Sequence, residues 1–191
     1  MSSWNQQSRF MALAVCVGAL AGCASGAGMP AAVAGGAMMP ALEDDAIASV
    51  VMTANTGEIE EAQLASTAAA AQSVHALATR IETDHRTSNE RALATLGALG
   101  SDSDPHPLRT SLVENHAQAM QALSPLRGPS FDRAFVERQI ALHRYLLSTI
   151  DHTLMPSART GPVRAQLTAD RAAVAAHLEM AETTLRGLGG G

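Results

Sequence analysis

Four long stretches of the chain carry apolar side chains at the three- and four-residue spacing of an amphipathic helix. They cover 42–68, 73–100, 130–154 and 163–185. Short turns separate the members of each pair, whereas a longer connection with a shorter helical pattern at 108–123 separates the two pairs. No stretch shows the alternation of a β-strand, so the sequence predicts an all-α fold.

Two helical hairpins joined by a long connection indicate a particular kind of bundle. Bundles with only short loops need no such crossover, whereas ferritin-like four-helix bundles contain one. The sequence therefore predicts a single ferritin-like four-helix domain at 42–188, with a short helix in the crossover.

One polar residue interrupts the apolar stripe of each long helix. The four residues are Glu58, His85, His143 and His177. Burial of a polar group costs on the order of a few kcal/mol unless the group is satisfied. At a rise of ~1.5 Å per residue, all four lie roughly 15–22 Å from the turn of their own hairpin, in helices about 39 Å long. We therefore expect them to meet in one layer near the midplane.

Two further carboxylates extend this candidate site. Glu82 and His85 form a Glu-x-x-His pair, whose spacing puts both side chains on one helix face, and Glu61 lies one turn from Glu58. The second hairpin has no such pair, which a di-metal site would require. Three histidines and one glutamate suit a single Zn, Cu or Fe ion better. The alternative is that the histidines are hydrogen-bonded core residues and hold no ion.

The other titratable candidates are interpreted as structural. Asp170 is expected to form hydrogen bonds at the edge of the core, and Asp132 to interact with a helix dipole. His116 borders the stripe of the short helix, where a structural role is expected. The remaining histidines, at the surface or in loops, are His75, His106 and His152.

The first 23 residues have the pattern of an export signal. A polar start with one arginine precedes an apolar run, 10–20, that is too short to span a bilayer. The run ends in Leu-Ala-Gly-Cys, which resembles a bacterial lipoprotein signal with Cys23 as the acylated residue. Ala24 follows, so the resemblance implies a lipid anchor in the outer membrane and a domain that faces the periplasm. An ordinary secretory signal is the alternative, and 24–41 is interpreted as a flexible tether.

Composition excludes some classes of function. The net charge of −5 and the absence of a basic patch argue against a nucleic-acid partner. No pattern of a nucleophilic hydrolase is present. The membrane, through the lipid anchor, is the one partner that the sequence predicts, and it indicates neither a protein partner nor an oligomeric state.

Three motifs and two histidines resemble one bacterial family. The motifs are NTGEI at 55–59, ATRIETDH at 78–85 and GPSFDRAF at 128–135, followed by His143 and His177. Their order and spacing are similar to those of the domain of unknown function 4142 family over about 42–188. The resemblance implies a ferritin-like fold and export, often with lipidation or outer-membrane association, and supplies no reaction.

Two functions remain open from the sequence. The first is a metal-binding lipoprotein with a role in metal handling or envelope stress. The second is a non-catalytic envelope protein that acts through a partner and whose core histidines are only hydrogen-bonded.

Overall fold

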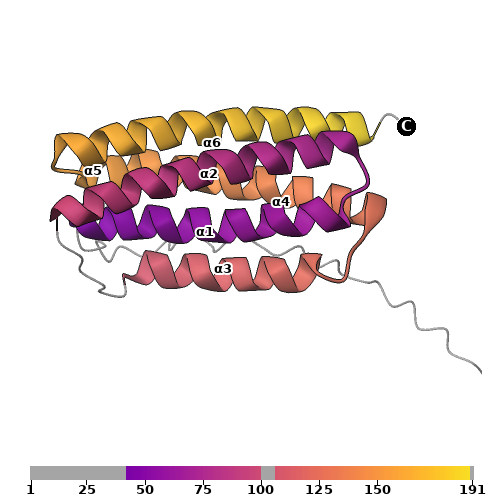
Figure 1. Cartoon of the computed structure of the whole chain (residues 1–191), viewed down its shortest axis with the longest axis horizontal. Helices are drawn as coiled ribbons and strands as arrows, with labels where there is room; N and C mark the ends of the chain where they lie inside the picture. Colours follow the sequence, from indigo (N-terminus) through magenta and orange to yellow (C-terminus); the bar gives the residue numbers. More distant parts are fainter. Residues whose placement is uncertain (1–41, 100–105, 190–191) are drawn as a thin grey trace, which may run out of the picture.

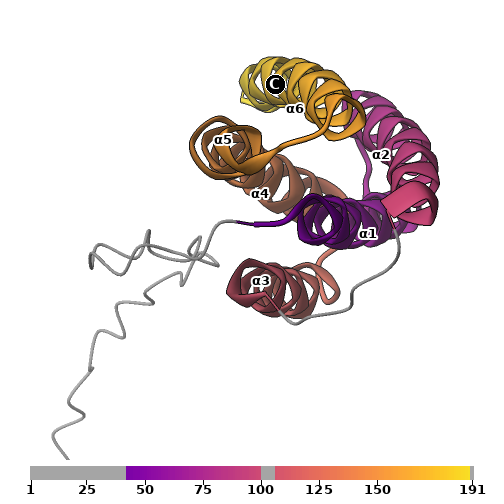
Figure 2. The same ribbon diagram turned by 90° about the vertical axis from the view of Figure 1, so that its left-hand side faces the viewer.

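The computed structural model describes residues 42–99 and 106–189. For 96–99 it describes the backbone alone. Four long helices lie side by side (Figures 1 and 2). They are α1 (Asp44–Ala68), α2 (Gln72–Leu99), α4 (Gly128–Thr149) and α6 (Gly161–Leu188). No strand occurs in the described residues, so the predicted all-α, ferritin-like four-helix bundle is confirmed. The proposed signal, Cys23 and the tether lie outside the described residues.

The four long helices are connected as two hairpins joined by a long crossover. α1 and α2 form one antiparallel hairpin, and α4 and α6 form the other. Between the hairpins, α3 (Pro107–Leu123) packs against the outer side of α1 (Figure 2). It returns the chain to the end of the bundle where α4 begins (Figure 1). The two hairpin turns therefore lie at opposite ends of the bundle (Figure 1). Within 42–99 and 106–189, no helix is both long enough and apolar enough to cross a membrane.

The close approach of α3 to α1 depends on a glycine. A Cβ atom at Gly57 would lie 3.0 Å from Cγ of His116, which projects from α3. A larger residue at position 57 would push the imidazole outwards. This glycine therefore lets the crossover helix lie directly on the bundle.

The apolar core is divided into two parts. One cluster includes Ile47, Val50, Leu146 and Leu167, and the other, towards the α1–α2 turn, includes Leu77, Ile81, Phe131 and Phe135. In α1 and α6 the residues between the two clusters include the buried Glu58 and His177, and in α4 the buried Gln139 and His143 flank the boundary between the clusters. The polar layer thus crosses the bundle at mid-height, as the helix rise predicted.

Two aspartates hold the hairpin turns. Asp132, near the start of α4, accepts hydrogen bonds from the backbone N–H groups of Ala70 and Ala71 in the α1–α2 turn, both at 2.9 Å. Asp44, at the start of α1, accepts in the same way from the two residues before α6, at 2.8 Å each. Each hairpin therefore supports the turn of the other. Asp132, interpreted from the sequence as a helix-dipole partner, instead holds a turn across the bundle.

Replacing Asp132 by alanine should lower the free energy of unfolding by about 2 kcal/mol, because two partly buried N–H groups lose a charged acceptor. Asp44→Ala should have a similar effect. Asp45→Ala is the matched control, since within the described residues Asp45 accepts from the neighbouring Ala46 N–H alone, and it should cost less than about 1 kcal/mol. Urea unfolding measures all three, and equal losses at Asp132 and Asp45 would contradict the support of the turn.

Candidate metal centre

The structure brings the four stripe-interrupting residues together. Glu58 comes from α1, His85 from α2, His143 from α4 and His177 from α6, and each is at most 3% exposed. Glu58 Oε1 lies 3.3 Å from Nε2 of His85, and Oε2 lies 3.3 Å from Nε2 of His143. His143 Nε2 lies 3.2 Å from Nδ1 of His177. One nitrogen of each ring therefore faces a common centre beside the carboxylate.

The other nitrogen of each ring faces outwards to an oxygen acceptor. These contacts are His85 Nδ1 to Asn55 Oδ1 at 2.8 Å, His143 Nδ1 to the Gln139 carbonyl at 2.8 Å, and His177 Nε2 to Asp84 Oδ2 at 2.9 Å. The Asn55 amide is oriented in turn, because its Nδ2 donates to Ser88 Oγ and Asn89 Oδ1. A ring nitrogen that meets an oxygen acceptor carries the proton. In the neutral form of each ring, the shorter outer contact favours the proton on the outer nitrogen and the lone pair towards the centre.

This tautomer leaves only acceptors at the centre. A neutral imidazole has one N–H and one lone pair, so the inward nitrogens of His85, His143 and His177 present lone pairs. Within the described part of the chain, neither Glu58 oxygen nor His85 Nε2 has a hydrogen-bond partner. Buried acceptors that face one another need a positive charge between them, supplied by a proton or by a metal ion.

The spacing of these acceptors fits one ion. Four ligands at ~2.0–2.1 Å from a tetrahedral ion lie ~3.3 Å apart, and the three contacts described above measure 3.2–3.3 Å. One nitrogen from each of the three histidines lies within 4.8 Å of the others. A metal-bound histidine usually donates its outer N–H to an oxygen acceptor, as each ring does here. Such an acceptor fixes the orientation of the ring and raises the basicity of the inward nitrogen. The buried triad could therefore hold a metal ion.

Without an ion, the cluster binds a proton. Burial opposes ionisation of Glu58, but electrostatic interactions with the neighbouring His85 and His143 outweigh burial and lower the Glu58 pKa to about 2. Burial likewise disfavours the imidazolium of His85, but the Glu58 carboxylate prevails and raises the His85 pKa. Burial lowers the pKa of His143, and burial together with the other two histidines lowers that of His177 to about 4. In the metal-free centre a proton is thus favoured on His85, beside Glu58, over one on His143 or His177.

Acid should destabilise the metal-free protein through His177. Its pKa falls from 6.5 to about 4 on folding, so the unfolded chain binds the proton first as the pH drops. This contribution to stability is complete above pH 6.5 and is lost as the pH falls towards about 4. The raised pKa of His85 acts in the opposite sense. Urea midpoints should therefore fall less steeply across this range in His177→Gln than in the wild type, and identical slopes would contradict the shift.

Glu82 and Glu61 are not brought to the centre. Glu82 is partly exposed and accepts hydrogen bonds from Arg86 and Gln63. Three residues turn a helix by about 300°, so Glu82 points about 60° away from His85 and reaches the rim. Glu61 is fully buried, but Arg138 donates to it at 3.0 Å and Gln139 at 3.0 Å. Both carboxylates therefore have other partners, which corrects their prediction as members of the candidate site.

The Glu61–Arg138 cluster, which also contains Asn115, His116 and Gln139, fills the space under α3. Arg138 Nη1 donates to Asn115 Oδ1 at 2.6 Å. His116 lies 3.3 Å from Glu61 and 2.8 Å from Glu60, and the hydrogen bond to Glu61 raises its pKa against the effect of burial. This agrees with the structural role expected for His116. Asp170 is likewise a hydrogen-bonding group, to Ser88 and Gln166.

Asp84 is the functional residue that sequence reasoning missed. It stands in the ATRIETDH motif directly before His85, yet its carboxylate contacts His177 on the neighbouring helix α6. Arg80 donates to the same oxygen at 2.6 Å from the surface. The only signal in the sequence was the adjacent Asp-His pair, and the contact itself depends on which helix lies next to α2.

The fold and the centre together define a ferritin-like helical domain with a buried three-histidine, one-glutamate cluster. The chain belongs to the family described as domain of unknown function DUF4142, whose match covers residues 28–184. This confirms the resemblance found in the motifs. Comparisons with curated proteins and with solved structures give no significant match. The family description supplies no activity, so a function must be argued from the geometry of the centre.

Proposed function

We propose that this protein binds one transition-metal ion through Glu58, His85, His143 and His177. The observation that carries the proposal is the set of buried groups: one nitrogen of each of three imidazoles and a carboxylate face one another, and in the neutral rings all of them are acceptors. A core that served packing alone would gain from apolar residues at these positions, because each buried polar group costs free energy unless it is satisfied.

The donor set limits the choice of ion. Three nitrogens and one carboxylate suit Zn, Cu or Fe, and the described residues offer no thiolate. The ligands are almost completely buried, whereas the side chain of Asp84, which holds His177, is 22% exposed. A buried ion would exchange slowly, and the Asp84–His177 pair offers a link between the centre and solvent. These features suit retention of metal in the cell envelope, in metal handling or in tolerance of envelope stress.

Metal analysis of untagged protein tests the proposal directly. Inductively coupled plasma mass spectrometry of protein purified without chelators should find about one equivalent of Zn, Cu or Fe per chain. The His143→Ala protein should contain none, whereas His152→Ala, which alters an exposed histidine, should match the wild type. A metal-free wild type would overturn the proposal. It would favour the second function, a non-catalytic envelope protein whose Glu58–His85 ion pair satisfies the centre.

We also propose that the domain is anchored to the outer membrane through an acylated Cys23. The family match begins at residue 28, just after this cysteine, which suits a mature domain that follows a removed signal. Cys23→Ser should leave the protein unacylated and release it from membrane fractions into the soluble periplasmic fraction. Fractionation with immunoblotting measures this, and a mutant that stays membrane-bound after a high-salt wash would contradict the lipid anchor.

A further inference from the structure

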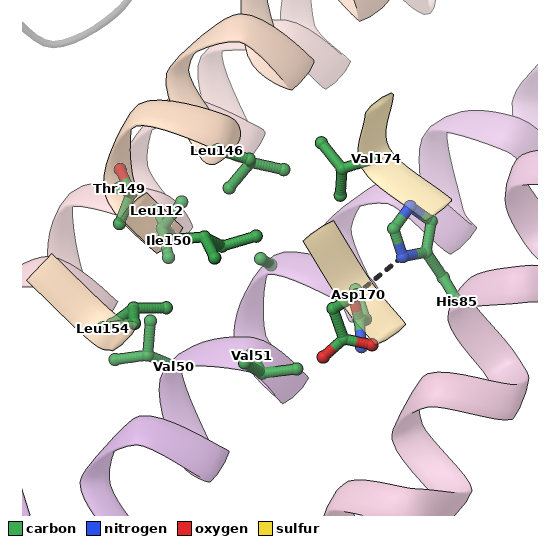
Figure 3. Close-up of a pocket in the computed structure, with 12 residues that line it drawn as sticks. Val50, Val51, His85, Leu112, Leu146, Thr149, Ile150, Leu154, Asp170 and Val174 are labelled. Atoms are coloured by element: carbon green, nitrogen blue, oxygen red, sulfur yellow. Dashed lines mark hydrogen bonds between the residues drawn. The ribbon is translucent and has the colours of Figure 1, made fainter. Parts of the chain in front are cut away.

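An apolar cavity of about 30 Å³ adjoins the candidate metal centre on the His85 side. Figure 3 shows the side chains of Val50, Val51, Leu146, Ile150 and Val174 around it, with His85 and Asp170 at one edge. These aliphatic side chains are all less than 9% exposed. The cavity thus lies inside the bundle, directly beside a proposed metal ligand.

The polar side chains at this edge already have partners. His85 Nδ1 is bonded to Asn55, and Asp170 accepts from Ser88 and Gln166. A buried water needs two to four polar partners, so a cavity with aliphatic walls and an occupied polar edge favours an apolar guest. Its chemistry therefore differs from that of the metal centre next to it.

The backbone beside the cavity is unusual. α4 continues into η1 (Ile150–Leu154), a π-helix, and both end residues of η1 line the cavity. π-helical turns are rare and occur frequently at functional sites. Regular α-helix would place these side chains differently, so the π-helix helps to shape the cavity wall.

We propose that this cavity binds a small neutral gas molecule, of the diatomic class to which dioxygen belongs, beside His85. Its volume is roughly one fifth of the ~150 Å³ of an engineered cavity that binds benzene, which suits a diatomic guest and excludes an aromatic ring. The proposal goes beyond metal binding and does not depend on it. A gas held here would lie next to whatever occupies the centre.

Dioxygen is a suitable probe, because it is paramagnetic and speeds the relaxation of the protons that it contacts. Methyl relaxation should be measured by NMR under oxygen pressure, in the mature protein both metal-free and loaded with Zn(II). The relaxation rate should increase several-fold more at the methyl groups of Val50, Val51 and Ile150 than at those of two control residues. The controls are Leu77 and Val136, which are fully buried in the other core cluster. Equal increases in both clusters would overturn the proposal. The metal-free sample gives this answer even if the centre binds no metal.

Filling the cavity provides the second test. Val174→Ile adds one methyl group at the wall and should abolish the relaxation enhancement at Val51 while the protein stays folded. If Val174→Ile fails to fold, Ala54→Val fills the same space from α1. The matched control is Val136→Ile in the other cluster, which should leave the enhancement unchanged. An enhancement that persists in the filled variant would show that the gas is not bound in this cavity.

Discussion

Adding Zn(II) to metal-free protein should raise its melting temperature by about 5–10 °C. A ligand that binds only the folded state at 100 times its dissociation constant contributes about 2.7 kcal/mol, and each kcal/mol shifts the melting temperature of a domain of this size by about 2–4 °C. The proposed ligands are neutral imidazoles and an ionised Glu58, so the shift should shrink as the pH falls through the histidine range. Differential scanning fluorimetry measures both effects.

The variants make this result specific. His143→Ala and His177→Ala should each abolish the shift, because each removes an inward nitrogen from the centre. The exposed His152→Ala should keep the full shift. Equal shifts in all four proteins would mean that Zn(II) binds elsewhere, and no shift in the wild type would remove support for the metal centre.

Glu61→Gln should lower the free energy of unfolding by about 3–5 kcal/mol, since it removes the charge that compensates a buried arginine. Arg138 is only 8% exposed and Glu61 is fully buried. Urea unfolding of the metal-free protein measures the loss. The expected loss arises in the Glu61–Arg138 cluster, outside the metal centre, because Arg138 is left without its charged partner.

An exposed pair supplies the control for this experiment. Glu82→Gln breaks a similar contact with Arg86 at the surface and should cost no more than about 1 kcal/mol. The double variant Glu61→Leu/Arg138→Met should recover much of the stability, because it removes both charges together. A loss in Glu61→Gln as small as that in Glu82→Gln would show that the buried pair is not strongly coupled.

The helices and the level of the polar layer could be predicted because both depend on distance along one helix. Periodicity identifies the inward face, and a fixed rise per residue gives the height of Glu58 or His177. The start of α4 was placed two residues late. Gly128, with φ of +61°, and the proline after it begin this helix, whereas the apolar pattern in the sequence starts at 130.

Contacts between helices were harder to predict. Which acidic residue of α2 reaches the ligands, Glu82 or Asp84, depends on how α2 is rotated about its own axis against α6. A rotation of tens of degrees would exchange one carboxylate for the other. Asp132 holds a turn of the opposite hairpin, which no local pattern indicates. The π-helix after α4 has the same apolar spacing as the helix that precedes it, so periodicity cannot distinguish them.

The two supported turns occupy equivalent places in the two hairpins. Asn55 lies as many residues after Asp44 as His143 lies after Asp132. In the second helix of each hairpin, Ser88 lies as many residues after the supported turn as His177 does. The same counting aligns Glu58 with Leu146 and His85 with Val174. Two ligands of the proposed metal centre thus correspond to two walls of the apolar cavity. At equivalent positions of the two hairpins, one therefore carries a titratable ligand where the other carries an aliphatic side chain of the cavity wall.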